Sequence, residues 1–173
     1  MNKKAMSLLL AGFAWAFSLD LASAADGLSP TAAFEKLKGL AGRWEGHAGT
    51  PDGPEGAVEY RVTAAQKLVM EVLFPGSDHE MVTFYYLDSD QLVAKHFCVM
   101  GNQPEMKLDA NASSENELHF AFTGGSNMDP AKDVHMHGGW IAIRGDRLES
   151  EWAVYKDGKE DGANRFFLSR AEN

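Results

Sequence analysis

The sequence has little that points directly to catalysis or to covalent cross-linking. It holds a single cysteine, Cys98, so no disulfide can form within the chain. Cys98 is therefore either a small buried thiol or a functional one. The chain also has neither the G-x-S-x-G turn of a hydrolase nucleophile nor the H-E-x-x-H helix of a zinc protease. An enzymatic function would rest on its clustered histidines alone.

Basic residues are scarce. Lys and Arg number 16 against 25 Asp and Glu. Without Lys3, Lys4 and Asp20, which belong to the N-terminal segment discussed next, the counts are 14 and 24, a net charge of −10. Nucleic acids and anionic membrane surfaces favour basic partners, so we expect neither as a partner. A small molecule is the expected ligand.

Long apolar runs are missing except at the start of the chain. Lys3 and Lys4 precede an apolar stretch that Asp20 ends before it reaches the 20 or so residues of a membrane-spanning helix. Ala22-Ser23-Ala24 is a small-residue cleavage site. This pattern predicts a signal peptide over residues 1–24, with cleavage after Ala24. We expect an exported protein, periplasmic or secreted, that does not insert into the membrane after cleavage.

The remaining residues, 25–173, have a length that suits one domain with one core. Ser29 and Pro30 are typical of a helix start, as the N-cap and the first helical position. Phe34, Leu37 and Leu40 then form one apolar stripe. We therefore expect a short helix at the beginning of the domain.

After this helix the apolar residues recur with a period of two, which indicates strands. Short turn segments such as Asp88-Ser89-Asp90 and Gly145-Asp146 separate the short runs. A β-sandwich would also fit this pattern, but mostly tight links between sequential neighbours favour an all-β, up-and-down antiparallel barrel of about ten strands. The expected strands are 43–49, 57–64, 68–74, 80–87, 91–99, 106–110, 118–122, 135–143, 147–155 and 164–170.

Several motifs carry a resemblance to known barrels. Gly42-Arg43-Trp44 resembles the G-x-W start of lipocalins and their calycin relatives, and Arg170 resembles the arginine that packs over that tryptophan at the closed end. A cation over an indole face is a physical reason for the pair. The pieces H-x-C-x-x-G-N-Q-P-x-M and H-M-H resemble a family of exported bacterial lipocalin-like proteins. That resemblance covers most of residues 25–173 and implies a fold without a particular activity.

A second, partial resemblance lies in the segment G-R-W-E-G-H-A-G, residues 42–49, which is similar to nitrobindin-type haem barrels. Haem would be the cofactor implied. The pattern departs from that family near the C-terminus, where the family carries its haem ligand and this chain has no histidine.

Strand counting places most histidines at one rim of the expected barrel. In an up-and-down barrel the odd strands end, and the even strands begin, at the same rim. His119 lies at the other end, together with Trp44 and Arg170, where the N-terminal helix would act as a plug. The residues expected at the open rim are His47, His79, His96, Cys98, His135 and His137, with the 101–104 and 124–134 loops.

Hairpin pairing predicts which way these side chains point, because directly opposed residues share a face. A two-residue turn at 145–146 sets residue 137 opposite Val154, which belongs to the interior set with Trp152. His135 and His137 are therefore expected to point inward. A bulge would shift this assignment by one residue.

The same reasoning applies to the expected fourth and fifth strands. A turn at residues 89–90 sets Thr83 opposite His96. Because Lys95 prefers the outer face, His96 and Cys98 are expected to point into the barrel.

Three functions remain open for this set of residues, beside a structural or partner-binding role of the outer face. The first is a binding module for a small, partly apolar ligand, held in a cavity lined by Tyr85, Trp152, Leu92 and Met81. A polar lining without further function is the plainer alternative. The ligand-binding residues expected on this hypothesis are His96, Cys98, Asn102, Gln103, His135, His137, Trp152 and Tyr85.

The second function is a metal- or haem-dependent enzyme or sensor. Histidines at positions i and i+2 of a strand can share a metal, so His135 and His137 with His96 would form a zinc-type ligand set. Zinc and haem are the two cofactors considered. The third is a cofactor-free enzyme, an isomerase or hydrolase, in which a histidine acts as general acid and base.

Overall fold

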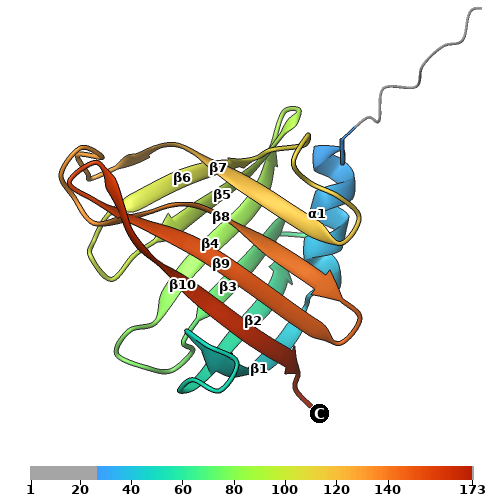
Figure 1. Cartoon of the computed structure of the whole chain (residues 1–173). Helices are drawn as coiled ribbons and strands as arrows, with labels where there is room; N and C mark the ends of the chain where they lie inside the picture. The colour runs from blue at the N-terminus through green and yellow to red at the C-terminus, as the bar shows by residue number, and fades with distance from the viewer. Residues whose placement is uncertain (1–26, 173) are drawn as a thin grey trace, which may run out of the picture.

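The computed structural model describes residues 27–172 and shows a closed antiparallel β-barrel of ten strands with one short helix (Figure 1). Every strand pairs with its neighbour in sequence, and β1 closes the ring against β10. This confirms the all-β, up-and-down barrel. The predicted signal peptide, residues 1–24, lies outside the described residues, and so do residues 25, 26 and 173 of the expected domain.

The elements follow the expected order with shifted ends. β6 begins earlier and β7 and β10 are longer than the alternating patterns indicate, since pairing extends these strands through polar and glycine-rich stretches. The bounds are α1 Pro30–Gly39, β1 Gly42–Ala48, β2 Glu55–Thr63, β3 Leu68–Leu73, β4 Met81–Asp88, β5 Gln91–Phe97, β6 Gln103–Leu108, β7 Glu117–Ser126, β8 His135–Arg144, β9 Arg147–Lys156 and β10 Lys159–Arg170.

Helix α1 lies at one end of the barrel (Figure 1). The Ser29 side chain accepts a hydrogen bond from the Ala32 amide at 3.2 Å, and Pro30 opens the helix, as predicted. Phe34 and Leu37 are buried in the core of the barrel. In the described part of the chain, no helix has the length and apolar character needed to cross a membrane.

The end that α1 covers is closed by a specific set of contacts. Trp44 is fully buried, and its indole Nε1 donates to the Leu40 carbonyl at 2.8 Å. The Arg170 guanidinium lies 4.4 Å from the centre of the Trp44 ring. It also donates to the carbonyls of Ala41 and Gly39, at 2.9 and 3.0 Å. Arg170 therefore joins the last strand to the end of α1.

The interior of the barrel is a packed core. Tyr85, Leu92 and Trp152, which the sequence places around a cavity, are each 0 % exposed and belong to this core. Of the four expected cavity residues, Met81 alone borders the pocket described below. The prediction of a cavity is wrong at these three positions, because large side chains from opposite walls meet and fill the space. Other fully buried large residues are Trp44, Tyr60, Phe166, Leu37, Leu40, Leu73, Met106, Leu118 and Ile141.

Strand β3 turns a carboxylate toward the interior. Tyr60 of β2 is opposite Glu71, and Glu71 is opposite Thr83 of β4. All three are buried, so this is the inward face. The alternating apolar residues that stand out in the sequence lie on the other face of the strand; they are Leu68, Met70 and Val72.

Strand β8 contains a bulge that changes the predicted register. Ile141 is opposite Ser150 and Gly139 is opposite Trp152, as expected. The register then shifts between Met136 and Gly138, so that Met136, and not His137, is opposite Val154.

Candidate functional site

A pocket of about 180 Å³ lies at the end of the barrel opposite α1. It forms where β5 ends and β8 begins, which is the rim predicted from strand counting. Three predicted site residues meet there: His96, Cys98 and His135. Apolar side chains make up most of the remaining wall. The full lining is Met81, His96, Cys98, Val99, Met100, Val134, His135, Met136, Val154 and Asn164.

His96 is the main polar group of this pocket. It points inward as predicted, is 1 % exposed, and is opposite Thr83. Its Nδ1 is hydrogen-bonded to the Thr83 hydroxyl at 3.0 Å. Burial lowers the pKa of His96 to about 4, so the ring is neutral at pH 7. Among the described residues Nε2 has no hydrogen-bond partner, and the His96 side chain lines the pocket.

A second buried polar group lies behind Thr83. The hydroxyls of Tyr60 and Tyr85 donate to the two carboxyl oxygens of Glu71, at 2.6 and 2.9 Å. Burial raises the pKa of Glu71, while hydrogen bonds from Tyr60, Tyr85 and Thr83 act in the opposite direction. Burial and the neighbouring carboxyl raise the pKa of both tyrosines well above the usual value. A polar chain therefore runs from Glu71 through Thr83 to His96 and the pocket.

The sequence predicted that Thr83 lies opposite His96, but it did not predict that Glu71 joins them in a polar chain. Glu71 stands between apolar residues in V-M-E-V-L, where either face of the strand could be the buried one. The register between β3 and β4 would have shown that Glu71 faces the interior. That register depends on the 74–80 connection, and no tight turn dipeptide fixes it by spacing alone.

Cys98 lies just beyond β5, in a tight turn that replaces the predicted loop. The Cys98 amide donates to the carbonyl of Asn102 at 3.1 Å, and the Gly101 amide donates to the carbonyl of Cys98 at 2.9 Å. Cys98 is a free thiol and is partly exposed at the pocket. β6 then begins at Gln103, earlier than predicted.

Asn102 and Gln103 support this turn and do not line the pocket. Asn102 is buried, and its Nδ2 donates to the Val134 carbonyl at 2.7 Å, which ties the turn to the start of β8. Its Oδ1 is buried without a partner among the described residues. Gln103 Nε2 donates to the Gly101 carbonyl at 2.8 Å. Asn102 and Gln103 were predicted to contact the ligand; in the structure they instead hold the turn that forms part of the pocket wall.

The prediction that His135 and His137 both point into the barrel is wrong. His135 is opposite Tyr155, next to the inward pair of Met136 and Val154, and His137 is the extra residue of the bulge. His137 stacks on Tyr155, with ring centres 3.7 Å apart, and on Phe122 at 4.3 Å. Met136 takes the interior position expected for His137.

The two histidines are hydrogen-bonded to each other. His135 Nδ1 lies 2.8 Å from the Asp133 carbonyl, which only accepts, so this nitrogen carries a proton. With both rings neutral, His135 Nε2 accepts from His137 Nδ1 at 2.9 Å. Both nitrogens of His135 are thus occupied. Burial, and then the neighbouring His135, lower the pKa of His137.

This arrangement does not suit the predicted zinc-type ligand set. Across residues 27–172, no three His, Cys, Asp or Glu side chains are placed to hold one metal ion. His96 faces the pocket, both nitrogens of His135 are engaged, and His137 lies between two aromatic rings. The three histidines therefore do not converge on a shared metal or haem iron.

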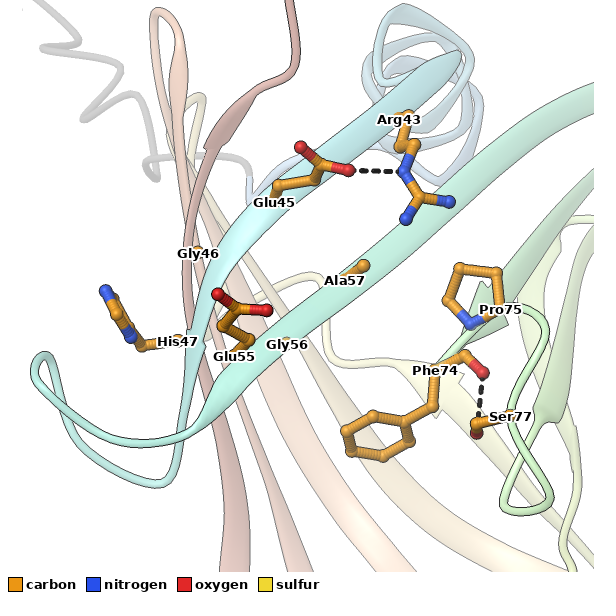
Figure 2. A pocket seen from close by; sticks show the side chains of 10 residues that line it. All are labelled: Arg43, Glu45, Gly46, His47, Glu55, Gly56, Ala57, Phe74, Pro75 and Ser77. Carbon is orange, nitrogen blue, oxygen red and sulfur yellow. Dashed lines mark hydrogen bonds and ion pairs between the residues drawn. The ribbon is translucent and has the colours of Figure 1, made fainter.

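A larger hollow of about 580 Å³ lies along β1, β2 and the 74–77 turn (Figure 2). Two of its polar side chains are already paired: Arg43 Nε donates to Glu45 at 2.6 Å, and His47 Nδ1 is hydrogen-bonded to the Gly53 carbonyl at 2.8 Å. Figure 2 shows His47 directed away from Phe74. This open hollow, lined by charged side chains, is a poorer match to a partly apolar ligand than the smaller pocket at His96.

Comparison with known proteins does not assign this chain to a family. A scan against protein-family models finds no match, and a search of the curated proteins finds no significant match either. The closed ten-stranded barrel is therefore the level at which the fold is established.

Proposed function

We propose that the chain is a lipocalin-like binding protein that holds a small, partly apolar molecule in the pocket at the open end of its barrel. The observation that carries the proposal is the 180 Å³ pocket, in which the buried His96 is the main polar group of an otherwise mostly apolar wall. Small-molecule sites typically combine such a wall with a few placed polar groups.

Two further features support a binding role at this end. The opposite end is sealed by α1, Trp44 and Arg170, so a ligand has access from the open end alone. The adjoining residues Val99 and Met100 are 50 % and 62 % exposed, unusually high for large apolar side chains. An apolar rim of this kind is typical of a binding surface.

The lipocalin-like assignment is part of the proposal. It is supported by the Gly42-Arg43-Trp44 start of β1 and by Arg170 over the Trp44 ring. Export rests on the sequence of residues 1–24 alone.

The methionine methyl groups provide a direct test of the site. Met81, Met100 and Met136 line the pocket, whereas Met70 lies on the outer face of β3. In ¹³C-methyl-methionine NMR of the purified chain, a library of small apolar compounds should include ligands that shift the three pocket methyls and leave Met70 unchanged.

A pocket-filling variant provides the control. Val154→Phe places a ring in the pocket and should abolish these shifts while the protein still unfolds cooperatively. Val82→Phe, on the outer face of β4, should leave them intact. Ligands that bind equally well to Val154→Phe, or a library in which no compound shifts the pocket methyls, would overturn the proposal.

A further inference from the structure

We infer that the ligand class of this pocket is a neutral, single-ring aromatic compound with one hydroxyl group, such as a phenol or an aromatic alcohol. The inference rests on the proposed binding function and specifies its ligand. It follows from the size, charge, polarity and sulfur content of the pocket.

The size of the pocket sets the size of the ligand. A cavity of about 150 Å³ in another protein holds benzene, while drug-sized ligands occupy about 300–1,000 Å³. At about 180 Å³, this pocket has room for one six-membered ring and a small substituent. Acyl chains and fused ring systems are too large to be enclosed.

The charge of the pocket excludes ionic ligands. None of its ten lining residues is Lys, Arg, Asp or Glu. The ring of His96 is held neutral by burial, and Thr83 separates it from the Glu71 carboxyl. A carboxylate or ammonium group would lose its hydration without gaining a partner of opposite charge, which is strongly unfavourable.

The polar chain behind the pocket favours a hydroxyl group over other polar groups. Thr83 has one proton, and it can face either Glu71 or His96 Nδ1. When Thr83 donates to Glu71, it accepts from His96 Nδ1 and leaves Nε2 as an acceptor; in the opposite arrangement Nε2 is a donor. A hydroxyl group bonds to Nε2 in both cases, whereas an ether or ketone bonds in one.

The sulfur content of the wall favours an aromatic ring. Met81, Met100, Met136 and Cys98 contribute four of the ten lining residues. Polarisable sulfur atoms make favourable contacts with aromatic rings, and methionine side chains adapt to the shape of a flat ligand. An aromatic ring is thus a better match to this wall than a saturated one.

Four one-ring probes test the class on the intact chain: phenol, toluene, anisole and benzoate, each titrated at pH 7 and followed by the methionine methyl shifts. Phenol is expected to bind most tightly. Toluene, which has no hydroxyl group, should bind roughly 2- to 12-fold more weakly, the effect of one neutral hydrogen bond. Benzoate should bind at least about 100-fold more weakly than phenol, since its charge would be buried unpaired.

Two measurements assign the hydroxyl contact to His96. In the unsubstituted protein, the ¹⁵N shift of His96 Nε2 should change with phenol and stay unchanged with toluene. In His96→Leu, phenol and toluene should bind with equal affinity, provided that the variant unfolds cooperatively. The ¹⁵N measurement needs no variant and so decides the point if His96→Leu does not fold.

The possible failures are distinguishable. If toluene or benzoate binds as tightly as phenol and shifts the pocket methyls, the ligand class is wrong and the pocket is still a binding site. If none of the four probes shifts the pocket methyls and the wider compound library also yields no pocket ligand, the proposed function fails together with the inference.

Discussion

At the scale of single residues, His96 and Glu71 are the two buried ionisable groups on which the pocket depends. Burial favours the neutral form of both, which lowers the pKa of His96 and raises the pKa of Glu71. The two residues therefore make opposite contributions to the pH dependence of stability.

For His96 we predict a loss of stability in acid. Its pKa falls from 6.5 to about 4 on folding, so its contribution is complete above pH 6.5 and is lost as the pH falls toward and below 4. From pH 7 to pH 4.5 this amounts to about 2–3 kcal/mol of unfolding free energy. Urea unfolding of the unsubstituted protein and of His96→Gln measures it. Parallel pH profiles in the two proteins would contradict the prediction.

For Glu71 we predict the reverse dependence on pH. Because its folded-state pKa is raised above 4.5, its contribution is complete below pH 4.5 and is lost as the pH rises through the raised pKa. Glu71→Gln removes the titrating group. The stability advantage of the unsubstituted protein over this variant should therefore shrink from pH 5 to pH 9 in urea unfolding; an advantage that grows over this range would contradict the prediction.

Glu71→Leu tests the hydrogen bonds of the same residue. It leaves the hydroxyls of Tyr60 and Tyr85 buried without an acceptor, and each such group costs about 1–3 kcal/mol. We expect a loss of about 2–4 kcal/mol of unfolding free energy, larger than for Glu71→Gln. Equal losses in the two variants would show that these hydrogen bonds contribute little.

At the scale of elements, the bulge in β8 decides which side chains reach the pocket. It brings Met136 to the interior and leaves His137 between Phe122 and Tyr155. Gly138 makes the bulge possible: its φ is +142°, and an added Cβ would lie 2.8 Å from the Phe120 carbonyl oxygen.

Gly138→Ala is therefore expected to destabilise the protein by about 1–3 kcal/mol through backbone strain and this close contact. Gly39→Ala is the matched control, because an added Cβ at this helical position meets no atom within 4 Å. Alanine is also the better helix former, so this variant should be as stable as the parent protein or slightly more so. Urea unfolding compares the two, and equal effects would contradict a specific role of Gly138.

At the scale of the whole molecule, the barrel has a closed and an open end. Arg170 connects the last strand, the end of α1 and Trp44 at the closed end. The pocket occupies the other end. A change at the closed end is thus expected to alter stability without altering binding at the pocket.

Arg170→Lys tests this separation. A lysine has no planar fork to reach both the Ala41 and Gly39 carbonyls, so we expect a loss of about 1–2 kcal/mol of unfolding free energy. Arg144→Ala, which removes an exposed arginine 3.8 Å from Glu117, should change it by less than about 0.5 kcal/mol. Ligand binding at the pocket methyls should be unchanged in both; weaker binding in Arg170→Lys would show that the two ends are coupled.

The sequence by itself determined the barrel, its strand order and the rim at which the site lies. Period-two apolar patterns and tight turns specify local strands and hairpins, since they depend on neighbours a few residues apart. The Ser89–Asp90 turn places Thr83 opposite His96, as predicted, and the Gly42-Arg43-Trp44 motif with Arg170 marks the closed end.

Only the tertiary structure decided what fills the barrel and which side chains face the pocket. The bulge at His137 moves side chains between faces by a shift of one residue, which the alternating pattern of the strand does not reveal. The inward position of Glu71 depends on the register across the 74–80 connection. The absence of the expected cavity at Tyr85 and Trp152 follows from how large side chains on opposite walls pack together, and that depends on distances across the closed barrel.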